Sequence, residues 1–377
     1  MSSLFIGLMS GTSVDAVDAA LVAFTGDKAQ LLKFHPLPVP KDLRADLVLL
    51  CDPGVRPLLE DYGRLGIRVG RLFAEAVQQL LTQAGMPADR ITAIGSHGQT
   101  LLHRPQLADP FSLQIGDPNT IAHLTGITTV ADFRGMDIAA GGQGAPLTPA
   151  FHEVQFRTES LNRVVLNIGG IANITVLPAD PTLPVTGFDT GPGNTLLDNW
   201  AQKHLDVPLD KDGRWARSGI IHQGLLARLK ADPYFPLPPP KSTGRDYFNL
   251  DWLARILDGL TPPPAPVDIQ ASLLRLTADT ITAAISRHAP ATQELLVCGG
   301  GAYNPVLMQA LEQAGGSACQ INSMARYGLD PSCIEAVAFA WLAQRRIEGR
   351  PGNLPSVTGA AQSVILGAVY AGSKVGG

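Results

Sequence analysis

Three short segments rich in glycine have a composition typical of phosphate binding. They are Ser10-Gly11-Thr12-Ser13, Gly169-Gly170 and Gly299-Gly300-Gly301, and each follows an apolar run. Glycine lets backbone N–H groups approach an anion closely because no Cβ stands in the way, and hydroxyl groups add further donors. A single segment of this kind is more typical of a tight hairpin turn. The set of three predicts that two turns hold a triphosphate and that the third contacts the nucleoside.

Two widespread nucleotide-binding patterns do not occur in the sequence. No lysine of the Walker type follows any of the glycine segments, so a P-loop is not indicated. No G-x-G-x-x-G pattern indicates a dinucleotide site either. The prediction of a phosphate site therefore depends on turns between paired strands.

Asp189 is the candidate general base. It lies between the apolar run Val185–Phe188 and the residues Thr190-Gly191-Pro192-Gly193, which places it just past a predicted strand. Ligands of open α/β sheets bind beside the ends of strands, so a carboxylate at this point can act on a bound substrate. The alternative is that Asp189 caps the helix predicted to begin near Asn194.

Three further polar residues suit the recognition of a small polar substrate. Arg134 offers a planar fork that matches a carboxylate, although a salt bridge with Asp132 or Asp137 explains it equally well. His97 follows a predicted strand and can donate a hydrogen bond to a sugar or phosphate; a hydrogen-bonded core histidine is the alternative. Glu335 begins a predicted helix, where the helix dipole stabilises a carboxylate without any ligand.

Pairs of strands are predicted on both sides of the first two glycine segments. Leu4–Met9 and Ala19–Phe24 indicate two antiparallel strands, and Ala29–His35 adds a third. A second beginning follows Arg163, where Val164–Ile168 and Ile171–Leu177 repeat the plan of strand, small turn and strand. The two copies share little sequence, so the repeat is one of architecture.

Helical and buried apolar segments follow these strands. Hydrophobic periodicity predicts helices over Glu60–Ala84, from about Asn194 to Leu205, Val267–His288, Pro305–Ala314 and Ser332–Ile347, with buried strands over Ile91–Ser96 and Leu295–Cys298. The stretches Pro233–Thr243 and Thr261–Pro266 are rich in proline and predict extended loops, with a polyproline motif that binds a partner as the alternative. Lys241, Ser242, Thr243 and Arg245 form either a surface loop or a lid.

Composition limits the class of protein. The chain has 377 residues, which suggests two lobes, and it is 45% hydrophobic and 16% charged, as in proteins with large cores. The net charge of −4 lacks the basic excess expected of a protein that binds nucleic acid. The four cysteines form no C-x-x-C pair, which favours free thiols in a reducing cytoplasm. Neither a signal peptide nor a membrane span is predicted.

Nine sequence blocks occur in order between Ile6 and about Ala343. They are IGLMSGTSVDAVD, GSHGQT, QIGDPNTIA, VADFRGMDIAAGGQGAPL, NIGGIANIT, GFDTGPGN, PPPKSTGRDYFN, CGGGAYN and EAVAFAWLA. Together they resemble the anhydro-N-acetylmuramic acid kinase family, within the superfamily of sugar kinases, actin and heat-shock chaperone ATPases. The resemblance implies two α/β lobes of ribonuclease-H-like (actin-type ATPase) fold with a nucleotide cleft between them. We expect the first lobe to span residues 1–131, with 344–377 packing back onto it, and the second to span 132–343.

The resemblance also implies an activity. Such enzymes are ATP-dependent sugar kinases in which water attacks the anomeric carbon of 1,6-anhydro-N-acetylmuramic acid while the bridging oxygen takes the γ-phosphoryl group. The product is N-acetylmuramic acid 6-phosphate, an intermediate of peptidoglycan recycling. Mg²⁺, a cytoplasmic location and a homodimer are implied with it. A kinase of another sugar, a phosphatase of the superfamily and an ATP-gated regulatory protein are the alternatives.

The resemblance assigns residues to each role. Asp189 is the base that accepts the proton of water. Asp15 or Asp18, which lie beside the first glycine segment, are the candidates to hold Mg²⁺ through water. The sugar contacts are His97, Gln99, Thr100, Asp132, Arg134 and Glu335. The nucleotide contacts are Ser10, Gly11, Thr12, Ser13, Val14, Asp15, Ala16, Val17, Asp18, Gly169, Gly170, Asn173, Gly191, Gly193, Gly299, Gly300, Gly301 and Asn304.

One position departs from the family pattern, because Ala16 stands where the family usually has glycine. Alanine disfavours a left-handed backbone. If that glycine is needed for a close approach of phosphate, the alanine lowers nucleotide affinity; otherwise the turn tolerates the extra methyl group.

Overall fold

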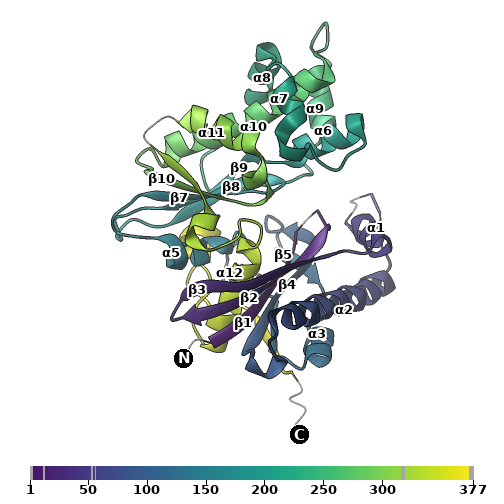
Figure 1. The fold of residues 1–377 in the computed structure, drawn as a ribbon, viewed down its shortest axis with the longest axis vertical. Helices are drawn as coiled ribbons and strands as arrows, with labels where there is room; N and C mark the ends of the chain where they lie inside the picture. The colour runs from purple at the N-terminus through teal and green to yellow at the C-terminus, as the bar shows by residue number, and fades with distance from the viewer. Residues whose placement is uncertain (1–2, 12, 52–53, 56, 316–318, 373–377) are drawn as a thin grey trace. The chain divides into compact units, whose positions relative to one another are not determined.

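The computed structural model describes residues 3–11, 13–51, 54–55, 57–315 and 319–372 (Figure 1). Two compact units make up the chain. The first contains Met1–Gln155 and Cys333–Gly377, and the second contains Phe156–Ser332. These boundaries differ from those expected from the sequence, because residues 132–155 and 333–343 belong to the first unit.

The sheet of the first unit has the strand order β12-β6-β4-β1-β2-β3, with β5 paired to β4. β1 is antiparallel to β2, which is antiparallel to β3, whereas β4 is parallel to both β1 and β6. The strands are β1 (Ser3–Ser10), β2 (Ala16–Thr25), β3 (Lys28–Pro38), β4 (Ala93–Arg104), β5 (Phe111–Ile115), β6 (Thr129–Ala131) and β12 (Ala368–Tyr370).

The sheet of the second unit repeats this plan with the strand order β11-β10-β7-β8-β9. β7, β8 and β9 form an antiparallel meander, and β10 is parallel to β7 and β11. Counted from β3 and from β9, both sheets therefore place the third, second, first and fourth strands of their unit side by side, and the next position holds β6 in the first sheet and β11 in the second, as in a ribonuclease-H-like fold. The strands are β7 (Arg163–Ile168), β8 (Ile171–Leu177), β9 (Thr186–Pro192), β10 (Glu294–Cys298) and β11 (Gln320–Ser323).

Helices cover the two faces of the first sheet. α2 packs one apolar stripe, with Leu65, Val69 and Phe73 at helical spacing, in the same core as Ile6 and Leu8 of β1. Alternate residues of a strand face opposite sides, so Gly7 faces the other helix, α12. The helices of this unit are α1 (Lys41–Leu50), α2 (Leu59–Ala84), α3 (Pro118–Thr125), α4 (Gly135–Ala139), α5 (Thr148–Phe156, ending at the unit boundary), α12 (Ile334–Ile347) and α13 (Pro355–Thr358).

Glycine allows α12 to lie directly on the first sheet. A Cβ at Gly7 would overlap the carbonyl oxygen of Ala336, and one at Gly95 would overlap that of Phe339. Strand and helix backbones therefore touch at these two points, and no other residue fits there. Because α12 packs on β1 and β4, the end of the chain belongs to the same unit as its beginning.

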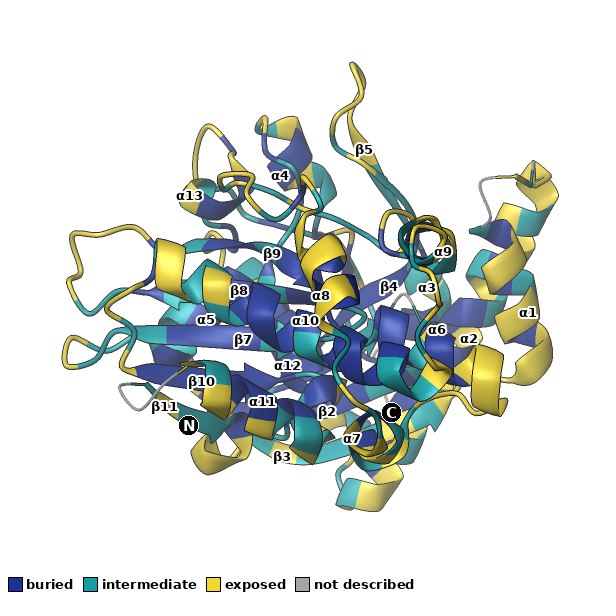
Figure 2. Cartoon of the chain, turned by 90° about the horizontal axis from the view of Figure 1, so that it is seen from above, coloured by how far each residue is buried: buried dark blue, intermediate teal, exposed yellow. Residues whose placement is uncertain are grey.

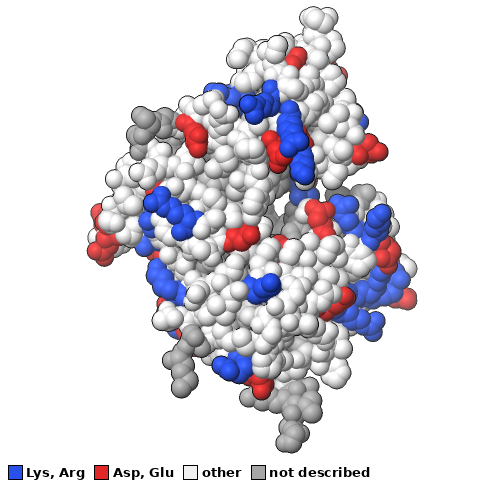
Figure 3. All heavy atoms as spheres, in the orientation of Figure 1, with Lys and Arg blue, Asp and Glu red and all other residues white. Residues whose placement is uncertain are grey.

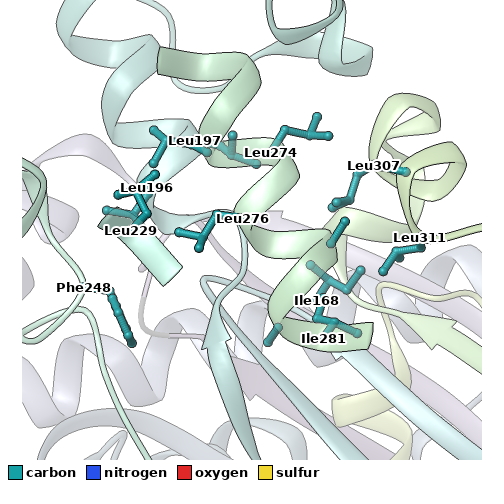
Figure 4. Packing of buried hydrophobic residues seen from close by; sticks show 14 of the residues in the cluster. Ile168, Leu196, Leu197, Leu229, Phe248, Leu274, Leu276, Ile281, Leu307 and Leu311 are labelled. Carbon is teal, nitrogen blue, oxygen red and sulfur yellow. The ribbon is translucent and has the colours of Figure 1, made fainter. Parts of the chain in front are cut away.

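The long helix α10 contributes many residues to the core of the second unit. Between Ile269 and Ile281 every residue except Arg275 is buried, so neighbours surround the helix on all sides. Figure 4 shows Leu274 and Leu276 close to Leu196 and Leu197 of α6. The helices are α6 (Thr195–Leu205), α7 (Arg214–Ser218), α8 (Gln223–Lys230), α9 (Leu250–Leu257), α10 (Pro266–His288) and α11 (Pro305–Gly315), with short 3₁₀ turns at Ala88–Arg90, Lys211–Gly213, Gly300–Tyr303 and Met324–Tyr327.

Burial follows the layers within each unit. Figure 2 shows buried residues in β7 and β10 and exposed residues on the outer faces of α1 and α8. Both proline-rich stretches lie outside helices and strands, as predicted, except that Pro266 begins α10. In the part of the chain that the structure describes, no helix is long and apolar enough to cross a membrane.

Candidate active site

The side chain of Gln99 is hydrogen-bonded to the turn that follows β1. The hydroxyl of Ser10 donates to Oε1 of Gln99 at 2.7 Å, and Nε2 of Gln99 donates to the carbonyl oxygen of Gly11 at 3.3 Å. Val14 closes the turn, since its N–H donates to the same carbonyl at 3.1 Å. Its φ of 55° is unusual for a β-branched residue, so the turn stores backbone strain, as functional turns often do. Thr12 lies outside the described residues.

The structure shows that Ala16 needs no left-handed backbone. This residue begins β2 and pairs with Pro38, and its backbone is not left-handed. Among the described residues of the turn, Val14 is left-handed, and a glycine at position 16 is not required by the backbone. Val17 is buried in the core of the unit, and Asp18 lies opposite Met9 of β1.

His97, Arg134 and Glu335 come together in the first unit although they are far apart in sequence. Nε and Nη2 of Arg134 donate to Nε2 of His97 at 3.2 and 2.8 Å. Burial lowers the pKa of Arg134 to about 10, while the carboxylates of Glu335 and Asp137 oppose this change. Three of the predicted sugar contacts therefore form one cluster.

His97 is neutral in this cluster. Its Nδ1 lies 2.9 Å from the carbonyl oxygen of Gly98, which can only accept a hydrogen bond, so Nδ1 carries the proton and Nε2 accepts from Arg134. Burial and the charge of Arg134 hold the pKa of His97 well below its usual range. The ring packs on Phe339, with 4.6 Å between centroids.

The salt-bridge interpretation of Arg134 is wrong. Its Nη1 donates to the carbonyl oxygen of Gly144 at 2.7 Å, and its other nitrogens donate to His97. Asp137 instead accepts hydrogen bonds from the backbone N–H of Gly144, from Asn353 and from Thr358, each at 2.7 Å. Asp137 thus fixes the loop that carries the Gly144 carbonyl, and that carbonyl fixes the guanidinium.

The remaining predicted sugar residues have hydrogen-bond partners outside this cluster. β4 continues through Thr100, where the sequence indicates a turn, because β4 pairs there with β5. Oγ1 of Thr100 accepts a hydrogen bond from Gln114 at 3.2 Å, and Gln99 supports the first glycine turn. Asp132 has a φ of 56° and accepts a hydrogen bond from Gly135 N–H at 3.3 Å, just before α4.

Hydrogen bonds from the residues just before α6 hold the glycine turn of the second unit. The N–H groups of Gly193 and Asn194 donate to the carbonyl oxygens of Gly170 and Gly169 at 2.9 and 2.8 Å. A Cβ at Gly193 would overlap the Gly169 carbonyl. Gly193 therefore contributes by fixing the turn, and the third glycine segment lies beside it, because Asn194 Nδ2 is the atom nearest to a Cβ built at Gly300.

One glycine in each of the three segments is not required by the fold. A Cβ at Gly11, Gly169 or Gly300 would approach no atom closer than 3.8, 3.6 and 3.8 Å, respectively. None of the three has a positive φ. By contrast, Gly299 has a φ of 78° and a Cβ at Gly301 would overlap Ile168.

Asn304 has a structural role. Its Oδ1 accepts hydrogen bonds from the N–H groups of Val306 and Leu307, both at 3.1 Å, so it caps α11. The side-chain oxygen of Asn304 is therefore bonded to the start of α11, directly after the third glycine segment.

Asp189 lies inside β9 at a β-bulge. Asn173 of β8 pairs with Asp189 and Ala172 pairs with Gly191, so Thr190 is the extra residue. Bulges redirect neighbouring side chains and occur often beside active sites. The sequence interpretation ended the strand at Phe188, whereas pairing with β8 continues it to Pro192.

The carboxylate of Asp189 contacts a loop and not a helix. Its Oδ2 accepts a hydrogen bond from the backbone N–H of Thr243 at 2.9 Å. The helix-cap interpretation is therefore wrong. Burial raises the pKa of Asp189 to about 6, and the hydrogen bond from Thr243 and the charge of Lys241 limit this rise. A carboxyl group with this pKa can accept a proton near neutral pH.

The sequence interpretation missed the surroundings of Asp189. Tyr234 donates its phenolic hydrogen to the carbonyl oxygen of Asp189 at 2.8 Å. Lys241 donates to the carbonyl oxygens of Tyr234 and Phe235 at 3.2 and 2.9 Å and lies 4.6 Å from the ring centroid of Tyr234. The adjacent aromatic residues in a proline-rich stretch were the available signal, since exposed loops seldom need two large rings.

Charges on the surface give no metal cluster. Among described residues, no group of three or more His, Cys, Asp or Glu side chains could hold an ion. Asp15 lies 2.9 Å from Nη2 of Arg44. Figure 3 shows positive and negative atoms interspersed over α1 and α2, where Arg68 pairs with Asp42 and with Asp46.

Comparisons with known proteins identify the family of the chain. The model of the family described as anhydro-N-acetylmuramic acid kinase matches residues 3–372. The chain belongs to this family. An anhydro-N-acetylmuramic acid kinase of Coxiella burnetii is 52% identical over 370 residues, covering 98% of each chain. The family members of Vibrio cholerae and Xanthomonas campestris are 51% and 50% identical, covering 97% and 98% of this chain and 98% and 97% of theirs.

Solved structures outside the family also match the chain. Component A of the (R)-2-hydroxyglutaryl-CoA dehydratase of Acidaminococcus fermentans is 13% identical with a TM-score of 0.47, covering 90% of this chain and 98% of that one. A ROK hexokinase of Thermus thermophilus is 17% identical with a TM-score of 0.37, covering 92% and 99%.

Proposed function

We propose that the protein is an ATP-dependent kinase that converts 1,6-anhydro-N-acetylmuramic acid, with water, to N-acetylmuramic acid 6-phosphate. Membership of the anhydro-N-acetylmuramic acid kinase family over residues 3–372 supports the reaction class and the substrate. The observation that carries the mechanism is the carboxylate of Asp189, which a backbone N–H orients at 2.9 Å and which has a pKa of about 6.

Asp189 serves as the general base in this reaction. It accepts one proton from water, and the water oxygen forms a bond with the anomeric carbon while the bond from that carbon to the bridging oxygen breaks. The bridging oxygen then takes the γ-phosphoryl group and ADP leaves. Atoms balance because the product contains the added water and the phosphoryl group. The raised pKa of Asp189 matches a base that works near neutral pH.

The open glycines support the nucleotide assignment. Gly11, Gly169 and Gly300 are required neither by packing nor by backbone conformation. A phosphate or nucleoside that approaches the backbone at these positions explains why no side chain stands there. Gly193 holds the second segment through its hydrogen bond to Gly170, and Asn304 caps the helix that follows the third segment.

The cluster of His97, Arg134 and Glu335 is the proposed sugar site. Arg134 provides a guanidinium for the carboxylate of the substrate, and neutral His97 aligns it. Glu335 lies in the first turn of α12 and can accept hydrogen bonds from sugar hydroxyl groups. Gln99, which is bonded to the first glycine turn, and Thr100, which follows it in β4, are proposed as further sugar contacts.

Mg²⁺ is proposed as the partner of ATP, with Asp15 and Asp18 holding it through water. The ion supplies charge neutralisation for the transferred phosphoryl group. A homodimer in the cytoplasm is proposed from the family resemblance alone. Light scattering of the purified chain measures the first property directly.

One experiment tests the proposed function. The protein is incubated with ATP, Mg²⁺ and the anhydro sugar in ¹⁸O-labelled water, and the product is analysed by mass spectrometry. We expect a product that gains one phosphoryl group and one water, with the label on the anomeric oxygen. A product that keeps the anhydro bridge, or ATP hydrolysis that ignores the sugar, would contradict the proposal. Asp189→Asn is the control that should give no product.

A further inference from the structure

Arg245 lies against the glycine turn of the second unit. A Cβ built at Gly170 would come within 2.8 Å of Nε and 2.9 Å of Nη2 of Arg245. The guanidinium group therefore occupies the space where a side chain of residue 170 would stand. Gly170 differs in this from Gly169, where an added Cβ would meet no atom closer than 3.6 Å.

The segment that carries Arg245 also contacts the general base. The N–H of Asp189 donates to the carbonyl oxygen of Lys241 at 3.1 Å, and the N–H of Thr243 donates to the Asp189 carboxylate at 2.9 Å. Residues 241–243 thus contact β9 through one backbone hydrogen bond and one hydrogen bond to the Asp189 side chain. Two residues later the side chain of Arg245 reaches Gly170, so one segment contacts both the base and the glycine turn.

Both ends of this segment are anchored. Lys241 is fixed by two carbonyl oxygens and the ring of Tyr234. After Arg245, the N–H groups of Tyr247 and Phe248 donate to the Gly244 carbonyl at 3.2 and 3.1 Å, and the ring of Phe248 is fully buried. A side chain between two fixed points is held with little loss of entropy when a ligand arrives.

Positive charge beside the transferred group favours phosphoryl transfer. Charge spreads over the equatorial oxygens of the transferred phosphoryl group in the transition state, and a planar guanidinium binds two of them at once. The sequence has no Walker lysine to provide this charge. Lys241 donates to the carbonyl oxygens of Tyr234 and Phe235, and Arg245 is the cation of this segment whose guanidinium group lies against Gly170.

We propose that Arg245 binds the γ-phosphoryl group during its transfer and that residues 241–245 set the distance between this group and the base Asp189. The inference depends on the proposed kinase function and adds a catalytic residue to it. Arg245 acts on the phosphoryl oxygens and transfers no proton. Thr243 is a positioning residue, because its backbone N–H orients the Asp189 carboxylate.

The test compares Arg245→Gln, Arg245→Lys and Arg217→Gln. Arg217 is an exposed arginine of α7 in the same unit and serves as the matched control. We expect Arg245→Gln to lower kcat by about a factor of 1,000 with an almost unchanged KM for ATP, since an arginine acting on the transition state contributes 10³–10⁵ in other phosphoryl-transfer enzymes. Arg245→Lys should recover part of kcat, and Arg217→Gln should match the unsubstituted protein.

A second measurement separates this inference from the proposed function. Calorimetry records the binding of MgADP with and without aluminium fluoride, which mimics the transferred phosphoryl group and needs no sugar turnover. Arg245→Gln should bind MgADP normally and lose the gain in affinity that the fluoride gives the unsubstituted protein. A folded Arg245→Gln variant that keeps this gain, or keeps its kcat, overturns the inference. Absence of the phosphorylated sugar with the unsubstituted protein would instead overturn the proposed function.

Discussion

The backbone N–H of Thr243 lies 2.9 Å from Oδ2 of Asp189, and this contact joins a proline-rich loop to the candidate base. Because a backbone donor cannot be lost by rotation of a side chain, the orientation of the carboxylate depends on the path of the loop. Lys241, two residues earlier, adds a positive charge on the same side.

The pH dependence of turnover should report the pKa of Asp189. Its pKa is about 6 and the base acts in its ionised form, so kcat falls as pH decreases through about 6. Lys241→Met removes a charge that favours the carboxylate and should shift the acid limb of the kcat profile to higher pH. A stopped assay between pH 4.5 and 9 measures this. Loss of rate at all pH values with an unchanged limb would show that Lys241 has only a structural role.

Removal of the Asp189 charge should stabilise the protein while it abolishes turnover. The folded pKa of about 6 exceeds the ordinary value of 3.8, so ionisation costs stability as pH rises through this interval. At pH 8 this cost is up to roughly 3 kcal/mol, from 1.36 kcal/mol per pKa unit. Asp189→Asn should therefore have a higher Tm than the unsubstituted protein at pH 8. Equal gains at pH 4 and pH 8 would argue against a raised pKa.

Substitution of Arg134 should act on the sugar and not on the nucleotide. Arg134→Lys replaces a planar fork with a single ammonium group, which cannot reach His97 and the Gly144 carbonyl at the same time. We expect KM for the anhydro sugar to rise at least about tenfold, which corresponds to roughly 1.4 kcal/mol, with little change in KM for ATP. Steady-state kinetics with each substrate varied in turn provides the test. A rise in KM for ATP alone would remove Arg134 from the proposed sugar site.

Ala16→Gly restores the residue usual in the family and should bring no gain in ATP affinity. Residue 16 lies in extended β2, so glycine there only increases the freedom of the unfolded chain. We expect a loss of about 0.5–1 kcal/mol in the free energy of unfolding. Urea denaturation and calorimetric titration with ATP measure the two quantities. Tighter ATP binding in this variant would show that the methyl group hinders phosphate.

Gly169→Ala should weaken ATP binding without loss of stability. The added Cβ would meet no protein atom closer than 3.6 Å, so the folded protein accommodates it. A phosphate that approaches this backbone would meet the methyl group instead. Gly63→Ala is the matched control. A Cβ at Gly63 would meet no atom within 4 Å, and Gly63 lies on the exposed side of α2. ATP affinity equal in both variants would place the phosphates elsewhere.

The sequence predicted the elements better than it predicted their ends. Apolar runs located β1, β2, β7 and β8 within a few residues, and helical spacing located α2 and α10. β4 and β9 extend past their apolar runs, through Thr100 and Pro192, because backbone pairing with β5 and β8 continues there. Hydrogen bonding between backbones leaves no trace in residue type, so the pattern alone places these ends too early.

In the candidate site, likewise, the sequence predicted individual residues better than the contacts between them. Glycine residues made the three segments candidates for phosphate binding, and the position after an apolar run made Asp189 a candidate base. The cluster of His97, Arg134 and Glu335 joins residues up to 238 positions apart, from 97 to 335, and no spacing rule predicts such a meeting. The Lys241–Arg245 segment has no periodicity, and its role follows only from the contacts with Asp189 and Gly170.

The direct contact of α12 with Gly7 and Gly95 also affects the order in which the chain can fold during synthesis. Residues 156–332 are contiguous and carry their own sheet and core, so they can complete their structure as soon as they leave the ribosome. The amino-terminal 155 residues emerge earlier, yet one face of their sheet stays uncovered until the helix of residues 334–347 is made. The part of the protein that is translated first is therefore finished last, and Glu335 reaches His97 and Arg134 only at that final step.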